Sequence, residues 1–236
     1  MSNSSLVSYT KKSPNYSART APISKITIHH MAGDYSLQSV GNSFANPNRQ
    51  ASSNYGIDSN GNIALYVDES CRAWTSSNKA NDNIAVTIEV ANCSGSPEWR
   101  VSDAAYSALI ELCADICKRN GIKQLNYTGG ATGNLTRHNM FANTSCPGKY
   151  LQDRFPQIAQ EVNKRLGVAQ NSAEKKSFLV RVTASALNVR AGAGVGYKIN
   201  TVVNKGEVFT IVDTSGDWGK LKSGAGWINL KYTQKI

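Results

Sequence analysis

A polar segment at residues 167–176, with the sequence GVAQNSAEKK, divides the chain into two parts of different character. Before it, apolar residues recur at helical spacing or alternate as they do in strands. After it come short alternating runs separated by Gly, Asn and Asp turns, with no apolar stripe long enough for a helix. A small, polar segment without periodicity is typical of a linker. The sequence therefore predicts a first domain over residues 1–166, a linker over 167–176 and a second domain over 177–236.

The first part predicts an α/β domain, with a mixed central sheet flanked by helices. The patterns predict strands at residues 25–30 and 84–90, a hairpin around Asn60-Gly61 within 54–67, and helices over 37–44, 102–121 and 151–166. Pro156 is expected to break or restart the last helix, because proline lacks the N–H that a helix interior needs. Residues 1–24 are expected to form an irregular arm. Cys113 and Cys117, four residues apart on one helix face, are expected in the core.

A loop rich in Asn, Thr, Pro and Gly, residues 136–148, contains an imidazole and a thiol, those of His138 and Cys146. A catalytic zinc site needs three protein ligands and one open position. His29, at the end of a predicted strand and on the opposite face from Ile28, would supply the third ligand. The residues alone leave an alternative open, in which His29 packs in the core, His138 caps a turn and Cys146 is a buried thiol.

Glu89 is anomalous, because the rest of its predicted strand is nearly all apolar. Such an apolar run is typical of a strand at the centre of a sheet. A carboxylate is costly to bury unless it is paired. Either a Lys or Arg from the surface pairs with it, or the carboxylate has a chemical task.

Four motifs in order resemble a known family: Ile26-Thr27-Ile28-His29-His30, Asn54-Tyr55, Ile88-Glu89-Val90-Ala91-Asn92, and Arg137-His138 followed by Ser145-Cys146-Pro147-Gly148. Over residues 10–166 the chain is similar to the zinc-dependent N-acetylmuramoyl-L-alanine amidases, which include many phage endolysins and are related to peptidoglycan recognition proteins. The resemblance implies a Zn²⁺ cofactor held by His29, His138 and Cys146, with His30 a packing or supporting residue. It also implies hydrolysis of the amide between N-acetylmuramic acid and the L-alanine of the stem peptide.

The resemblance further implies roles for three residues around the metal. Glu89 matches the acid/base that takes a proton from water and passes it to the leaving amine. Thr144 stands where many relatives have a lysine that stabilises the oxyanion, and can only donate a neutral hydrogen bond. Tyr55 matches a tyrosine of the active-site wall, although plain packing is an equal alternative. Thr75 replaces a histidine that follows the tryptophan in many relatives.

The second part predicts a small closed β-barrel. Its motifs Leu187-Asn188-Val189-Arg190-Ala191-Gly192, Gly216-Asp217-Trp218 and Gly226-Trp227-Ile228 resemble the bacterial SH3-like cell-wall-binding domain. The polar or aromatic candidates for ligand contact are Asn188, Arg190, Tyr197, Trp218 and Tyr232. Trp218 and Trp227 are as well suited to filling the barrel.

The net charge of +10 is spread along the chain, without a Lys/Arg run or a basic helix that would favour nucleic acid. We therefore expect bacterial peptidoglycan and associated wall polymers as partners, and no nucleic acid. The N-terminal region lacks the apolar stretch of a secretory signal, and no run approaches the ~18 apolar residues of a membrane span. We expect synthesis in the cytoplasm of a host bacterium, no stable membrane insertion, and action on the wall after release.

Two other functions fit parts of these observations. One is a non-catalytic peptidoglycan receptor on the same fold, although a pure binder has no need of an open metal site. The other is a cysteine peptidase with Cys146 as nucleophile and His138 as base. Reactive thiols favour helix N-termini, however, and Pro147 removes one backbone donor there.

Overall fold

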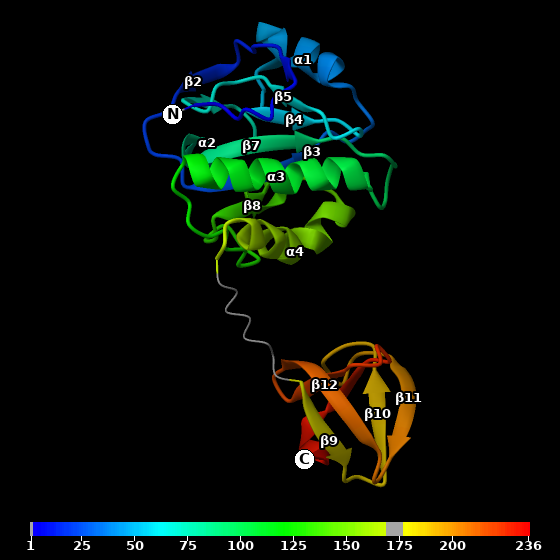
Figure 1. Cartoon of the computed structure of the whole chain (residues 1–236). Helices are drawn as coiled ribbons and strands as arrows, with labels where there is room; N and C mark the ends of the chain where they lie inside the picture. The colour runs from blue at the N-terminus through cyan, green and yellow to red at the C-terminus, as the bar shows by residue number, and fades with distance from the viewer. Residues whose placement is uncertain (1, 169–176) are drawn as a thin grey trace. The chain divides into compact units, whose positions relative to one another are not determined.

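The computed structural model describes residues 2–168 and 177–236, which form two compact units separated between residues 169 and 170 (Figure 1). Most of the predicted linker, residues 169–176, lies outside the described residues. Gly167 and Val168 are described, and they close the end of the preceding helix, their amides donating to the carbonyls of Lys164 and Asn163. Gly167 adopts the left-handed conformation, with φ +67°, that commonly ends a helix.

A six-stranded mixed sheet forms the centre of the first unit (Figure 1). Its strands in spatial order are β1 (Tyr9–Thr10), β5 (Ile63–Leu65), β4 (Tyr55–Ile57), β7 (Ala85–Val90), β3 (Lys25–His30) and β8 (Leu135–Arg137). Strands β4, β7, β3 and β8 run parallel, and β4 and β5 form the predicted antiparallel hairpin. A separate antiparallel pair joins β2 (Tyr16–Ala18) to β6 (Cys71–Ala73). The two strands predicted at residues 25–30 and 84–90 are therefore neighbours at the middle of the sheet.

Two long helices, α3 (Asp103–Arg119) and α4 (Lys149–Arg165), cover one face of this sheet (Figure 1). Ile26 and Ile28 of β3 and Ile88 of β7 pack with the apolar residues of these helices in one core cluster, which also contains Cys113 and Cys117 as predicted. The other residues of each strand must face away from α3 and α4, because side chains alternate along a strand. The sheet thus presents a second face built from different residues.

The second face is polar at its centre. Thr27 and Thr136 are fully buried there and share a hydrogen bond of 2.9 Å between their hydroxyls. His29 and Glu89 follow in the same rows of β3 and β7. The neighbouring part of this face is covered by α1 (Leu37–Ala45), whose buried residues pack against Ala64 and Tyr66. A short helix, α2 (Lys79–Ile84), leads directly into β7.

Two expectations about the first unit were wrong. The arm at residues 1–24 is not irregular throughout, because β1 extends the sheet edge beside β5 and β2 pairs with β6. Helix α4 continues through Pro156. Pro156 lies on the exposed side of the helix, while Phe155 and Ile158 on either side of it are buried in the core. Packing of these neighbours holds the helix together across the position where one backbone hydrogen bond is missing.

The second unit is a seven-stranded antiparallel sheet. Its strands in spatial order are β11 (Ile199–Asn204), β10 (Ala186–Arg190), β14 (Trp227–Asn229), β13 (Trp218–Leu221), β12 (Val208–Ser215), β9 (Phe178–Val182) and β15 (Thr233–Lys235). Buried aliphatic residues from six of these strands form one core, so the sheet curls around its own interior. The predicted all-β unit is confirmed. The sheet has two edge strands, β11 and β15, whereas a closed barrel without edges was expected.

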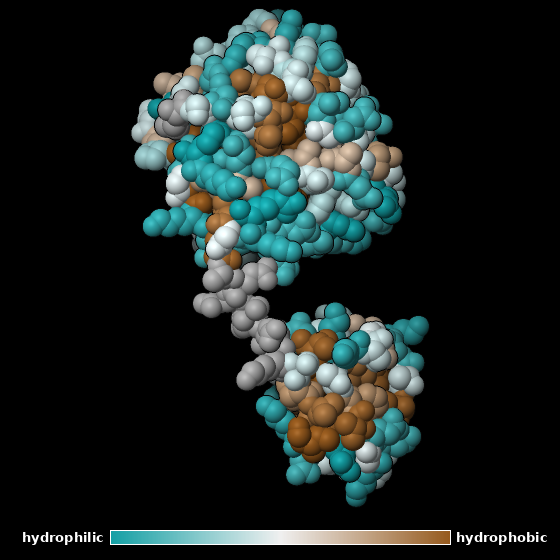
Figure 2. Space-filling model, viewed as in Figure 1, coloured by the Kyte–Doolittle hydropathy of each residue, from teal (hydrophilic) through white to brown (hydrophobic). Residues whose placement is uncertain are grey.

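The surface of the second unit exposes several large hydrophobic side chains among hydrophilic ones (Figure 2). Leu179, Val202 and Val208 are examples, from three different strands. Among residues 2–168 and 177–236, every helix is too short or too polar to cross a membrane.

Candidate metal centre and active site

His29 is the penultimate residue of β3 and projects from the polar face of the sheet. Its side chain is only 1% exposed. The ring nitrogen Nδ1 lies 3.7 Å from Cys146 Sγ, and Nε2 lies 3.3 Å from the hydroxyl of Ser76. The two nitrogens therefore face different partners, and Nδ1 is the one directed at the thiol.

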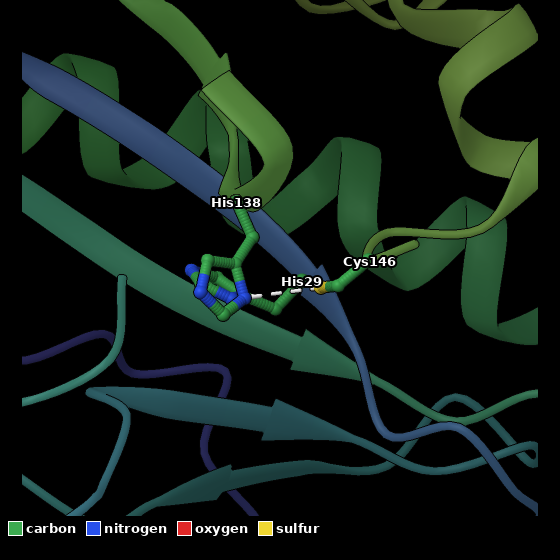
Figure 3. Close-up of side chains that lie close together, drawn as sticks. All are labelled: His29, His138 and Cys146. Carbon is green, nitrogen blue, oxygen red and sulfur yellow. Dashed lines mark hydrogen bonds between the residues drawn. The ribbon is translucent and has the colours of Figure 1, made fainter. Parts of the chain in front are cut away.

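His138 and Cys146 reach the same point from the loop after β8. His138 begins a 3₁₀ turn, His138–Met140, and the amide of Asn139 donates to the carbonyl of Cys146 at 3.1 Å, which closes the loop on itself. The backbone amide of His30 donates to Cys146 Sγ at 3.4 Å. Figure 3 shows the side chains of His29, His138 and Cys146 converging from β3, from the end of β8 and from the segment before α4. The sequence-predicted ligand set is thus brought together, with its ligand atoms all within 4.8 Å of one another.

The arrangement fits a zinc ion. Bonds of about 2.3 Å to sulfur and 2.0–2.1 Å to nitrogen at tetrahedral angles place the two ligand atoms about 3.6 Å apart, and the His29 Nδ1 to Cys146 Sγ distance is 3.7 Å. His138 Nε2 is buried and has no hydrogen-bond partner among the described residues, as expected of an atom reserved for a ligand. Burial lowers the pKa of both His29 and His138, which favours the neutral imidazoles that bind metals.

Glu89 lies beside this set because β3 and β7 are in register, with His29 and Glu89 as direct neighbours. Its Oε1 is 4.0 Å from His29 Nδ1, and the side chain is 17% exposed. Oε2 is buried without a hydrogen-bond partner, and no Lys or Arg of the described residues lies within ion-pair distance. Burial raises the pKa of Glu89 to about 8, against an opposing effect of the charge on Arg49. The alternative of a surface ion pair for Glu89 is therefore wrong in the described part of the chain.

An open cavity of about 570 Å³ leads to these groups. Its walls come from the end of β3, from α1 and from the loop before α4, and they include Glu89, His138, Thr144 and Cys146. The hydroxyl of Thr144 accepts a hydrogen bond from the amide of Cys146 at 3.2 Å, so it also holds the ligand loop in shape. A fixed positive charge in this cavity is supplied by Arg49, which follows α1 in a short 3₁₀ turn.

Comparison with known proteins identifies the first unit. A family model described as N-acetylmuramoyl-L-alanine amidase matches residues 19–149, which is 131 of 236 residues and more than half of the chain. The chain belongs to this family. A model described as bacterial SH3 domain matches residues 185–234 of the second unit. Both resemblances expected from the motifs are confirmed.

Solved structures share the fold of the first unit. A Staphylococcus aureus hydrolase, AmiA in complex with its ligand, is 14% identical with a TM-score of 0.54, over 71% of this chain and 95% of that one. A selenomethionine derivative of AmpD is 20% identical with a TM-score of 0.51, over 67% and 99%. A mutant endolysin from Bacillus subtilis is 14% identical with a TM-score of 0.51, over 65% and 97%. At these identities the likeness shows the fold, and no curated protein matches the sequence.

Tyr55 does not line the cavity of this amidase-family domain, so its expected place in the active-site wall is wrong. Along β4, Tyr55 belongs to the core cluster under the helices, while the next residue, Gly56, is the one paired with Glu89. The Tyr55 hydroxyl donates to Glu69 at 2.6 Å and accepts from the amide of Ser4 at 2.9 Å. Tyr55 is therefore a packing residue of the core, which was the alternative expected from the sequence.

Three residues around the site carried no clear sequence signal. Ser76 holds His29 Nε2, and Asn81 in turn donates to the hydroxyl of Ser76 at 3.3 Å. Arg49 lines the cavity. They lie in a loop, in the short helix α2 and in a 3₁₀ turn, where no periodicity indicates which way a side chain points. His30, in contrast, packs as expected, its ring edge-on to Trp99 at 5.1 Å between centroids.

In the SH3-like unit the structure brings together two of the five predicted residues. The Arg190 guanidinium donates to the backbone carbonyls of Val195 and Tyr197, at 2.7 and 2.8 Å, and so ties down the loop that carries Tyr197. Tyr197 and Tyr232 are exposed, and Asn188 and Trp218 are partly exposed. The described core of this unit consists of aliphatic residues, so Trp218 and Trp227 do not fill it.

Proposed function

We propose that the protein is a zinc-dependent hydrolase that cleaves the amide between N-acetylmuramic acid and the L-alanine of the peptidoglycan stem peptide. The observation that carries this proposal is the convergence of His29, His138 and Cys146 within 4.8 Å, with Glu89 beside them on the floor of an open cavity. Membership of the amidase family supports the reaction type.

His29, His138 and Cys146 would hold the metal, leaving its fourth position open. Bound zinc polarises an amide carbonyl and lowers the pKa of water to about 7. Glu89 would accept a proton from the attacking water and deliver it to the leaving amine. Two observations support this role: its Oε1 lies 4.0 Å from His29 Nδ1, and its Oε2 has no hydrogen-bond partner among the described residues. Proton delivery matters because an amide releases its amine far more readily as the neutral, protonated leaving group.

The cysteine-peptidase alternative fits the site less well. Burial raises the pKa of the Cys146 thiol, whereas a nucleophilic cysteine needs a lowered pKa. Cys146 also lies before the start of α4, with Gly148 at the helix cap between them. Both observations count against Cys146 as an attacking group.

The SH3-like unit would direct the enzyme to the wall. Linking a binding unit to a catalytic one raises the local concentration of substrate without any new contact at the active site. We propose wall polymers as its ligand and an endolysin role for the whole chain, made in the cytoplasm of a host bacterium and released onto the wall.

The proposal is tested by zinc analysis together with the products formed from purified cell walls. About one zinc per chain and new N-terminal L-alanine on the released peptides are expected. Walls left intact by zinc-loaded protein would favour the receptor alternative. Hydrolysis that survives chelation but stops on thiol alkylation would favour the peptidase.

A further inference from the structure

A second hollow, of about 450 Å³, adjoins the catalytic cavity. It lies between the loop after β7 and the first turn of α4, and Trp99, Asn139 and Gln152 are among its walls. Ser145 lines both this hollow and the catalytic cavity, so the two meet next to the ligand Cys146.

Trp99 is held firmly at the edge of this hollow. Its backbone is in the left-handed region, with φ +50°, which is uncommon for a bulky residue. Its carbonyl accepts from the Asn92 side chain at 2.9 Å, and its amide donates to the carbonyl of Gly95 at 2.9 Å. Gly148 leaves the space that Trp99 needs, since a Cβ on that glycine would lie 2.7 Å from Trp99 Cβ. The backbone of Trp99 is thus fixed beside the ligand loop, and its indole packs against the ring of His30.

The remaining walls of the hollow offer neutral hydrogen-bonding groups. The Asn139 amide donates to Gln152 Oε1 at 2.7 Å, and the Gln152 Nε2 group has no acceptor among the described residues. Lys149 and Asp153, which also line the hollow, form an ion pair with each other, so their charges cancel. The catalytic cavity, in contrast, is lined by the charged residues Arg49 and Glu89. An aromatic surface with amide groups and no net charge suits an uncharged sugar ring, whose C–H face packs on the indole while its hydroxyl and acetamido groups bond to the amides.

We propose that this hollow binds the N-acetylated sugar next to the muramoyl residue whose amide is cleaved. This inference rests on the proposed amidase function. The scissile amide joins the glycan to the peptide, so the substrate must leave the catalytic cavity in two directions. The hollow beside Trp99 takes the glycan direction, and the enzyme therefore prefers substrates with at least two sugars.

The test compares two soluble substrates with the full-length zinc-loaded protein: a muramoyl peptide with one sugar, and the same peptide on an N-acetylglucosaminyl-muramoyl disaccharide. The wild type is expected to favour the disaccharide substrate by about tenfold in kcat/KM, which corresponds to about 1.4 kcal/mol. In Trp99→Ala the ratio falls to about one, whereas Trp99→Phe retains most of it because the aromatic surface remains. Glu98→Gln, an exposed neighbour outside the hollow, leaves the ratio unchanged.

Zinc content and circular dichroism show whether Trp99→Ala has folded, and Gln152→Ala provides a second variant from a different element. A wild-type ratio of one, or a full ratio in both Trp99→Ala and Gln152→Ala, overturns the inference. If the wild type hydrolyses neither substrate, the proposed function has failed, and the peptide-free disaccharide then tests the hollow by calorimetry. Binding that Trp99→Ala weakens about tenfold supports the subsite, and binding that is absent or insensitive to Trp99 overturns it.

Discussion

Ser76→Ala should loosen the metal site without touching a metal ligand. Ser76 is completely buried, and its hydroxyl lies 3.3 Å from His29 Nε2. Because Nδ1 of His29 is directed at Cys146, Nε2 carries the proton and needs an acceptor. The backbone of Ser76 is held separately, since its amide donates to Asp82 at 3.0 Å. The substitution therefore removes the acceptor and leaves the loop in place.

The expected magnitude follows from two independent considerations. Loss of a partner that orients a metal-binding histidine typically lowers metal affinity by about 10- to 100-fold. A buried donor left without an acceptor costs about 1–3 kcal/mol, which is a similar factor. We expect the zinc dissociation constant of Ser76→Ala to rise within this range, measured at equilibrium by competition with a chelating indicator.

Ser107→Ala is the matched control, because Ser107 is an exposed serine on α3. It should bind zinc as the wild type does. If Ser76→Ala also retains wild-type affinity, within about threefold, then the hydrogen bond to Nε2 does not orient His29 and this reasoning is refuted.

Four further outcomes are expected. Glu89→Gln should bind zinc normally but lose at least about 100-fold in kcat, and near-normal turnover would remove the acid/base role. Chelation should abolish wall hydrolysis and stoichiometric zinc should restore it, whereas activity indifferent to chelation would contradict a metal mechanism. Arg119→Ala should lower the free energy of unfolding by about 3–5 kcal/mol, because the fully buried carboxylate of Glu69 loses its ion-pair partner. Arg165→Ala, at a more exposed ion pair, should lower it by less than about 1 kcal/mol, and equal losses would refute this account. Deleting residues 177–236 should weaken wall binding more than hydrolysis of small soluble substrates, and equal loss of both would refute the division of labour.

The central strands and their facing could be predicted from sequence because strand periodicity is local. Alternation along residues 25–30 put His29 opposite Ile28, and the structure has Ile28 in the core and His29 on the polar face. The same periodicity explains the error at Tyr55. A shift of one residue along β4 exchanges the two faces of the sheet, and Gly56, not Tyr55, is the residue beside Glu89.

The supporting residues could not be predicted, because their positions depend on tertiary packing. Ser76 and Arg49 come from irregular segments, which only the folded sheet brings to the site. Pro156 shows the same limit for a helix. Proline by itself favours a break in the helix, but the buried side chains of Phe155 and Ile158 keep α4 continuous.

Gly56 shows how the sheet and the cavity wall depend on each other. It lies next to Glu89 in register, and a Cβ there would meet the Tyr66 ring at 2.6 Å. The hydroxyl of Tyr66 donates to the carbonyl of Leu37 at 2.9 Å, at the start of α1. Since Val40 and Phe44 of α1 line the catalytic cavity, a side chain at position 56 would displace Tyr66 and, through it, the helix that shapes the cavity. The position beside Glu89 therefore requires glycine because any side chain there would disturb Tyr66 and, through it, the wall of the cavity.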